Sequence, residues 1–528
     1  MPPGEQFDLL IGEPPRGFML ARGRMKGRAW RRSSVASVPG QASPGESRFG
    51  TTAPQIEFRE VFDDWSGGDG YAYRTSAPPN GLHWSENADA RWPGQILHCQ
   101  ALTTVSVDTG GAGALVNAVN LIDTPLPWTT PQPPGTGAVG VMQYDVFGAG
   151  DFDLFLLAPT TVGIGPGALD VNILGLEVIA GRPANFGSYS YVPTATGPQF
   201  YGVARGFGST LIGSWNGGGR HFVAAGQRLW RAHDLPQGGS ALTSLALGGS
   251  APNAADWSAT LPVGSGVEKI QDLIAYGEQV FAGVPDGLYA GDQSGSFFNV
   301  SGELAGIVHA DNCRDLTVHE GEVVFPHVTG IYAHDPTNTE RGRIRQVSPA
   351  QRSSRFPIHG QHRAVKSYAG WLYAGLFTGS ASYLRAGREV APGDWRWHTL
   401  HRLPHPSRIN RVHFDGITVS SGGVRQLPQR LWVATDASFV TSGTAPLYVS
   451  PIPRLNHNPL ACDPVFSANY VGSARFDLPA VDRGAPGVRK IGESLEVWAD
   501  GLVPGVRYAD VYYSADRGPR TLLGRAQT

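Results

Sequence analysis

Short stretches of alternating apolar and polar residues, separated by glycine-containing turns, make up much of the chain. The segments "VFAGVPDGLYAGD" at 280–292 and "VVFPHVTGIYAHD" at 323–335 share one register: an apolar strand, a short turn and a second strand with a central tyrosine. A period of two bounded by turn residues predicts β-hairpins. Apolar positions rarely recur at helical spacing for more than one turn. We therefore predict an all-β protein.

Three further segments have the same form: "FVAAGQRLWRAHD" at 222–234, "LYAGLFTGSASYLRAG" at 372–387 and "LWVATDASFVTSGTAPLYVS" at 431–450. Each copy has an aromatic residue in its second strand, which we expect in the core of a repeated sheet: Trp230, Tyr289, Tyr332, Tyr383 and Tyr448. These aromatics are separated by 59, 43, 51 and 65 residues. Such spacings have room for a four-stranded sheet in every copy.

A ring of small sheets is the arrangement that buries both faces of each one, since neighbours pack face to face. Two weaker copies are "FDLFLLAPTTVGIG" at 152–165 and "YGVARGFGSTLIGSW" at 201–215. The pattern predicts a β-propeller of about seven blades, with a range of six to eight, over residues 111–465. A pair of β-sandwiches is the alternative, because any protein rich in hairpins has aromatic strands and glycine turns.

The flanking segments differ from the repeats. Residues 1–57 predict an extended basic arm, because residues 31–54 could not form a core. Residues 16–32 contain seven basic residues and no acid. The residues expected to dock this arm onto an acidic partner are Arg22, Arg24, Lys26, Arg28, Trp30, Arg31 and Arg32. A solvated tail is the alternative reading of such a run.

Residues 58–110 form a Trp-rich segment, and residues 466–528 form a small β-strand module. The acids of the Trp-rich segment do not have the spacing of an EF-hand loop, so we expect no metal there. The C-terminal module has about three or four strands, too few for an independent sandwich. We expect it to contact the propeller or another chain.

Composition restricts the partners. The net charge of the 528-residue chain is -2, which gives no general reason to expect nucleic acid or an anionic membrane. Cys99, Cys313 and Cys462 match no zinc spacing. Neither a secretory signal nor a run of 18 apolar residues is visible. A protein made in the cytoplasm, either soluble or part of an assembly, is expected.

Enzymatic signals are weak. "SADRGPRT" at 514–521 fits the start of a sialidase-type Asp-box, but Thr521 stands where Trp is expected, and "RFPIHG" at 355–360 is not the accompanying arginine strand motif. In an extended strand His398 and His401 would point to opposite faces, which disfavours a shared metal and favours surface or inter-blade histidines. "GDFD" at 150–153 and "HADNCRD" at 309–315 supply carboxylates with no catalytic spacing. We expect no enzyme and no cofactor.

The layout of arm, Trp-rich segment, propeller and terminal module resembles that of minor tail and tail-fibre proteins of long-tailed bacteriophages, especially those with GC-rich hosts. Phe62 to Gly70 ("FDDWSGGDG") and Asn87 to Gly94 ("NADARWPG") match phrases that precede a propeller-like body in those proteins. The resemblance implies a non-enzymatic structural protein of the virion tail or tail tip, made in the host cytoplasm.

The partners implied are other tail proteins, further copies of the chain and a host-surface glycan, with no nucleic acid and no membrane span. The alternative function is a sialidase-like propeller glycan hydrolase or lyase. An enzyme would gather charged residues of several blades into one pocket, whereas a structural ring would fill that position.

Overall fold

The computed structural model describes residues 64–70, 80–91, 96–105, 219–236, 238–249, 254–292, 295–337, 344–348, 360–415, 472–478, 508–513 and 519–526. It also describes strands and a few adjoining residues within the intervals 9–32, 143–216 and 418–452. The chain divides into two compact units, Met1–Val481 and Asp482–Thr528.

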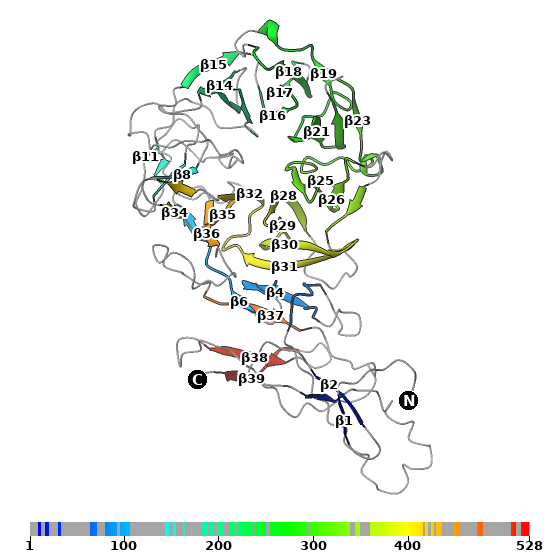
Figure 1. The fold of residues 1–528 in the computed structure, drawn as a ribbon, viewed down its shortest axis with the longest axis vertical. Helices are drawn as coiled ribbons and strands as arrows, with labels where there is room; N and C mark the ends of the chain where they lie inside the picture. Colours follow the sequence, from blue (N-terminus) through cyan, green and yellow to red (C-terminus); the bar gives the residue numbers. More distant parts are fainter. Residues whose placement is uncertain are drawn as a thin grey trace. The chain divides into compact units, whose positions relative to one another are not determined.

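The first unit contains six four-stranded antiparallel sheets in its described part (Figure 1). Sheet 1 comprises β12 (Ala184–Phe186), β13 (Tyr189–Pro193), β14 (Gln199–Ala204) and β15 (Leu211–Asn216). Sheet 2 comprises β16 (His221–Ala225), β17 (Arg228–Asp234), β18 (Ser240–Ala246) and β19 (Leu261–Pro262). Sheet 3 comprises β20 (Asp272–Tyr276), β21 (Gln279–Val284), β22 (Gly287–Gly291) and β23 (Phe297–Asn299).

The remaining sheets follow the same order. Sheet 4 comprises β24 (Thr317–His319), β25 (Glu322–His327), β26 (Gly330–His334) and β27 (Ile344–Gln346). Sheet 5 comprises β28 (Gln361–Tyr368), β29 (Trp371–Phe377), β30 (Ser382–Ala391) and β31 (Asp394–Arg402). Sheet 6 comprises β32 (Ile409–Asp415), β35 (Gln429–Thr435), β36 (Leu447–Ile452) and β7 (Thr103–Val105).

Neighbouring sheets contact each other mainly through their first strands. β12 contacts β16, β16 contacts β20, and β28 contacts both β24 and β32. Apolar residues of adjacent sheets share clusters: Phe281 and Leu288 of sheet 3 pack with Val323 and Phe325 of sheet 4. The prediction of an all-β fold is thus confirmed, and the repeated four-stranded sheets have a propeller-like arrangement.

The fourth strand of sheet 6 comes from far earlier in the chain. Tyr448 of β36 pairs with Thr104 of β7 in antiparallel register. The other five sheets take all four strands from one continuous stretch. Sequence patterns of local hairpins contain no signal for this long-range pairing.

The repeated hexapeptides, "GLYAGD" at 287–292 and "GIYAHD" at 330–335, contain the third strands of their sheets, β22 and β26, and begin directly after the turn from the second strand. In sheet 3 the Tyr289 hydroxyl donates to Asp286 Oδ2 at 2.9 Å, and in sheet 4 the Tyr332 hydroxyl lies 2.9 Å from Thr329 Oγ1. Each tyrosine therefore reaches a polar side chain three residues earlier. The two hexapeptides have the same place in their sheets, in agreement with the shared register predicted for residues 280–292 and 323–335.

One of the five predicted core aromatics occupies a different strand. Tyr289, Tyr332, Tyr383 and Tyr448 lie in the third strands of their sheets, whereas Trp230 lies in β17, the second strand of sheet 2. The predicted equivalence of Trp230 with the tyrosines is wrong because both hairpins of a sheet read as apolar strand, glycine turn and strand. Trp230 is nevertheless buried, as are three of the tyrosines, while Tyr332 is half-buried.

Only one of the two weaker copies of the repeat forms the predicted hairpin. The segment 201–215 belongs to the β14–β15 hairpin. The segment 152–165 is not a hairpin, because β9 (Asp151–Leu154) pairs with β8 (Gln143–Val146), and β10 (Val162–Gly163) pairs with β11 (Asp170–Val171). A further hairpin, β33 (Thr418–Ser420) with β34 (Val424–Gln426), lies between β32 and β35 in the sequence.

The predicted arm contains local strand pairing. β1 (Leu9–Ile11), β2 (Arg16–Leu20) and β3 (Trp30–Arg32) form a three-stranded antiparallel sheet, so this stretch is not uniformly extended. Of the docking residues, Arg22, Arg24, Lys26 and Arg28 lie outside the described residues. Trp30, Arg31 and Arg32 form β3, of which only the backbone is described.

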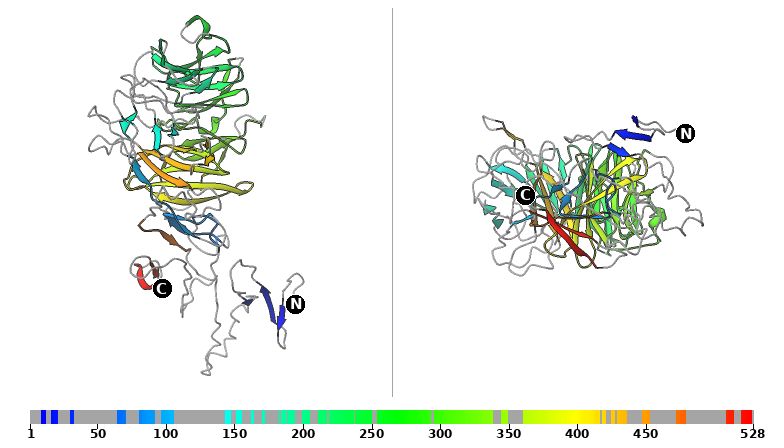
Figure 2. Two further views of the ribbon diagram at one scale, coloured as in Figure 1. Left: turned by 60° about the vertical axis from the view of Figure 1, so that its left-hand side comes forward. Right: turned by 90° about the horizontal axis from the view of Figure 1, so that it is seen from below.

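The Trp-rich segment lies along the outer strand of sheet 5. It contains β4 (Trp84–Glu86), β5 (Ala88–Asp89) and β6 (Leu97–His98), and both β4 and β5 contact β31. The blue strand β4 lies next to the yellow β31 in Figure 1 and in the turned view of Figure 2. β4 also pairs with β37 (Arg475–Asp477), so the beginning of the predicted C-terminal module belongs to the first unit.

The second unit, Asp482–Thr528, contains the antiparallel hairpin of β38 (Ala509–Tyr513) and β39 (Thr521–Ala526). Helical structure in the described residues is limited to two short 3-10 turns, Ala254–Asp256 and Gly302–Leu304. A membrane-spanning helix is not found in the part of the chain that the structure describes.

Candidate functional site

One register position recurs near the start of the first strand in all six sheets. In each sheet it lies four residues before the last residue of the first strand. These last residues are Phe186, Ala225, Tyr276, His319, Tyr368 and Asp415. The residues at this position are Arg182, His221, Asp272, Asp315, Ala364 and Arg411. Equivalent positions in repeated sheets bring side chains together. We call Arg182, His221, Asp272, Asp315 and Arg411 the charged centre.

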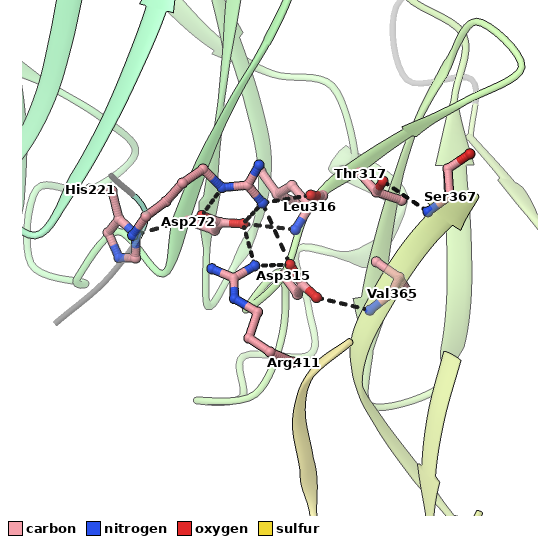
Figure 3. A network of polar contacts seen from close by, with 9 residues as sticks. His221, Asp272, Asp315, Leu316, Thr317, Val365, Ser367 and Arg411 are labelled. Atoms are coloured by element: carbon pink, nitrogen blue, oxygen red, sulfur yellow. Dashed lines mark hydrogen bonds and ion pairs between the residues drawn. The ribbon is translucent and has the colours of Figure 1, made fainter. Parts of the chain in front are cut away.

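Two arginines of the charged centre share two carboxylates (Figure 3). Arg182 Nε lies 3.0 Å from Asp272 Oδ1, and Arg182 Nη2 lies 2.7 Å from Asp272 Oδ2 and 3.5 Å from Asp315 Oδ1. Arg411 Nη1 donates to Asp315 Oδ1 and lies 3.7 Å from Asp272 Oδ2. Ion pairs therefore connect sheets 3, 4 and 6 with the residue that precedes sheet 1.

Backbone amides complete the coordination of both carboxylates. Asp272 Oδ2 accepts from the Leu316 amide at 2.8 Å, and Asp315 Oδ2 accepts from the Val365 amide of sheet 5 at 3.0 Å. Every oxygen of the two carboxylates thus has a donor. Burial raises the pKa of Asp272, but the guanidinium groups of Arg182 and Arg411 outweigh burial and hold it below its usual 3.8.

His221 contributes no charge to the centre. Its Nδ1 accepts a hydrogen bond from the Arg182 amide at 3.2 Å, which requires an unprotonated nitrogen. Burial lowers the pKa of His221 despite the neighbouring Asp272. Two arginines therefore balance two aspartates, and all four side chains are at most 13% exposed. The arrangement suits a structural connection, because every oxygen of the two carboxylates already accepts from a donor of the protein.

Part of this centre was visible in the sequence. Asp315 belongs to the "HADNCRD" carboxylates, whereas Asp272, Arg182 and Arg411 were missed. Aligning "QDLIAYGEQV" at 271–280 with "RDLTVHEGEV" at 314–323 would have placed Asp272 and Asp315 in one column. "GDFD" includes β9, whose side chains lie outside the described residues.

An arginine layer lies next to the charged centre: Arg314 and Arg363 come one residue before Asp315 and Ala364, which occupy the recurring register position. Arg363 Nε donates to Asp311 Oδ1 at 2.6 Å, and Arg363 Nη1 donates to Asn410 Oδ1 at 2.8 Å. Arg314 Nη1 lies 3.6 Å from the same Asp311 oxygen. We define the arginine layer as Arg314, Arg363 and Arg408 together with Asp311 and Asn410.

The Trp-rich segment is attached to sheet 5 through a buried carboxylate. The Asp69 amide donates to Trp397 O at 2.6 Å, while the Asp69 carboxylate accepts from Ser85 Oγ and the Thr399 amide, each at 2.7 Å. Burial raises the pKa of Asp69, opposed by the charge of Arg385. The "FDDWSGGDG" phrase therefore supplies a strand-edge contact.

The "NADARWPG" phrase makes a second attachment. Asn87, at a φ of 59°, donates from Nδ2 to Ser473 O at 3.1 Å and accepts from the Arg402 amide at 2.9 Å. Arg91 makes a two-point ion pair with Asp89 and donates to the Tyr373 hydroxyl at 2.8 Å. Burial alone would raise the pKa of Asp89, yet Arg91 lowers it to about 2.

The histidines of sheet 5 are buried, and two of them share a face. Ala386 pairs with His398 and Leu384 pairs with His401, with a β-bulge between Leu384 and Arg385. Because residues 384 and 386 lie on one face of β30, their partners do too. The prediction of opposite faces is wrong because the bulge inserts an extra residue in β31. Of the two predicted locations, the surface is also wrong, since the side chains of His398 and His401 are at most 6% exposed.

Burial keeps these histidines neutral. It lowers the pKa of His398 to about 3, and those of His401 and His362 to about 4. Within the described residues no group of three or more His, Cys, Asp or Glu side chains could hold a metal ion. The Asp-box residues 514–518 and residues 355–359 of "RFPIHG" lie outside the described part.

Comparison with known proteins gives no family. No family model and no curated protein matches the sequence. Among solved structures, the extracellular domain of a one-component system from B. thetaiotaomicron is 13% identical, with a TM-score of 0.41 over 67% of this chain and 40% of that one. The chain thus spans less than half of that protein.

Two other solved structures are similar at the same low level. AztD from Citrobacter koseri is 12% identical, with a TM-score of 0.33 over 52% of this chain and 75% of its own. A luciferin-regenerating enzyme is 11% identical, with a TM-score of 0.35 over 52% of this chain and 92% of its own.

Proposed function

We propose that the protein is a non-enzymatic structural component of a bacteriophage tail or tail tip. Its sheets form a closed propeller of about seven blades that serves as a rigid platform for assembly contacts and for binding the host surface. It resides in the virion after synthesis in the host cytoplasm. Its partners are other tail proteins and further copies of the chain. The phage assignment rests on the sequence resemblance, whereas the non-enzymatic platform rests on the structure.

The chain order supports seven blades. β7 gives the fourth strand of sheet 6, and the next complete sheet begins at β12. The interval between them contains the pairs β8–β9 and β10–β11, which together could supply four strands of a further sheet. Such a sheet would lie between sheet 6 and sheet 1 and would close the ring.

The observation that carries the structural role is the charged centre. Its carboxylates are buried, neutralised by Arg182 and Arg411 and saturated with donors. A glycan hydrolase needs one carboxylic acid with a raised pKa, and usually two carboxyl groups at a set separation. The position where an enzyme would gather reactive groups instead holds cross-sheet ion pairs, which favours a platform.

The assembly role is tested on purified phage particles from the source of this sequence. Mass spectrometry of the particles should detect the chain in a fixed ratio to the major tail protein, and antibody labelling should mark the tail. A chain recovered only from the lysate, and absent from washed particles, would refute the proposal.

The enzymatic alternative needs a separate assay. The isolated protein should release no product from sialosides or from acidic and neutral polysaccharides. Hydrolysis or elimination that disappears in Asp311→Asn, in a variant that keeps its thermal unfolding midpoint, would instead support a propeller glycan hydrolase or lyase.

A further inference from the structure

The arginine layer holds more positive than negative charge. Arg314, Arg363 and Arg408 come from the beginnings of sheets 4, 5 and 6, and the first two share one carboxylate, that of Asp311. Arg363 neutralises this carboxylate at 2.6 Å. Arg314 is only within 3.6 Å of it.

The two other arginines are poorly compensated. The guanidinium carbon of Arg408 lies 5.7 Å from the centre of the Phe377 ring, a contact that supplies only weak stabilisation of charge. The side chain of Arg314 is 35% exposed. Burial and the charges of Arg363, Arg411 and Arg408, only partly opposed by Asp311, together lower the pKa of Arg314 to about 10. An anion beside Arg314 would relieve this repulsion.

The surroundings restrict the size of that anion. Arg363 is only 12% exposed, so a bulky charged group could not reach it. Ile307 and Val308, on the loop that leads to Asp311, are 45% and 55% exposed. A planar carboxylate matches the fork of a guanidinium group, and the carbon-bound face of a sugar ring can cover exposed aliphatic side chains.

We propose that the arginine layer binds the carboxylate of an acidic sugar, with Arg314 and Arg408 as the main contacts and Arg363 fixed between Asp311 and Asn410. This inference deepens the proposed host-surface binding and rests on it for the choice of a glycan. Arg314 is the more exposed of the paired arginines, so it meets the ligand first.

Calorimetric titration of the full chain with glucuronate tests the site, with glucose as the matched ligand that lacks the carboxylate. Glucuronate should bind, glucose should not, and affinity should fall as salt is raised. Arg314→Gln and Arg408→Gln should each weaken glucuronate binding by about tenfold or more, since a charge-assisted hydrogen bond is lost. Arg388→Gln, an exposed arginine of β30, is the control and should bind normally.

Because two arginine variants are compared, the test still decides the proposal if one of them fails to fold. No glucuronate binding by the native protein at millimolar concentration would overturn the site. Equal binding of glucose would also overturn it, as would equal loss in Arg388→Gln. Binding of inorganic phosphate or N-acetylaspartate tighter than glucuronate would overturn the assignment to an acidic sugar. Presence of the chain in phage particles is measured independently, so failure here is distinct from failure of the structural role.

Discussion

Gly287 and Gly330 occupy the same place in consecutive sheets and have nearly the same backbone conformation. Their φ angles are 147° and 151°, in the region that favours glycine. A Cβ atom on Gly287 would lie 2.5 Å from Ser301 Oγ, and one on Gly330 would lie 2.5 Å from Ser348 Oγ. The repeated hexapeptide therefore begins with glycine because both the backbone and the neighbouring serine exclude a side chain.

Gly330→Ala should consequently destabilise the protein. We expect a loss of about 1–3 kcal/mol in the free energy of unfolding from backbone strain. Urea unfolding followed by tryptophan fluorescence measures it. Gly306→Ala is the control, because a Cβ atom there has no neighbour within 4 Å and the residue has no positive φ. Equal effects of the two substitutions would show that the turn does not need glycine.

The charged centre should respond strongly to removal of one arginine. Arg411→Met removes the guanidinium group closest to the buried Asp315 carboxylate, while Arg182 remains 3.5 Å from it, and we expect a loss of about 3–5 kcal/mol in unfolding free energy. The double variant Arg411→Met/Asp315→Leu should cost less than the two single losses combined. Arg402→Gln, which breaks the half-exposed pair with Glu86, should cost less than about 1 kcal/mol. Additive single losses would contradict coupling in the centre.

Stability should fall in mild acid because of the buried histidines of sheet 5. Their pKa values of about 3 to 4 lie below the ordinary 6.5, so the unfolded chain takes up protons first as the pH falls. Each histidine should lower the unfolding free energy by roughly 1.4 kcal/mol per pH unit between pH 6 and its folded-state pKa.

The histidine contribution can be separated from that of the carboxylates by pH window and by substitution. The lowered pKa values of Asp272 and Asp89 affect stability only below about pH 4, where these groups begin to be protonated in the unfolded chain. His398→Leu should reduce the slope of the unfolding free energy against pH, between pH 6 and pH 4, by the contribution of about one proton. An unchanged slope in denaturant titrations at several pH values would show that His398 is protonated in the native state.

The basic arm should be protected from proteolysis only in the assembled particle. If Arg22 to Arg32 dock onto an acidic partner, trypsin will remove residues 1–50 from the free protein but leave them intact in the virion. Mass spectrometry of limited digests distinguishes the two cases. Trimming at the same rate in both states would contradict docking by the arm.

Local hairpins were the part of the fold that the sequence could predict. Tyr289, Tyr332, Tyr383 and Tyr448 lie in strands that pair with their neighbours in the sequence, and alternation and turn residues predict such pairs because they act within a few positions. Trp230 belongs to a first hairpin and the tyrosines to second hairpins, but both hairpins have the same residue pattern. Pattern alone cannot tell which of two successive hairpins it describes.

Features that depend on distant parts of the chain were not predictable in the same way. The β-bulge that puts His398 and His401 on one face has no residue pattern in this sequence that would reveal it. It is seen only from the pairing of β30 with β31. The members of the charged centre are related only by the pairing register of their strands. Arg182 and Arg411 meet Asp272 and Asp315 because repeated sheets bring one register position together, a relationship that spacing alone does not reveal.

The pairing of β7 with β36 also determines when the polypeptide can finish folding. During synthesis Thr103–Val105 leaves the ribosome long before Leu447–Ile452, so the early strand has no hydrogen-bonding partner until translation is nearly over. A nascent chain that stalls late will carry sheet 6 with one vacant edge, whereas sheets 1 to 5 already have all four of their strands. A chaperone or a second copy that occupied that edge would therefore act at the last step of maturation.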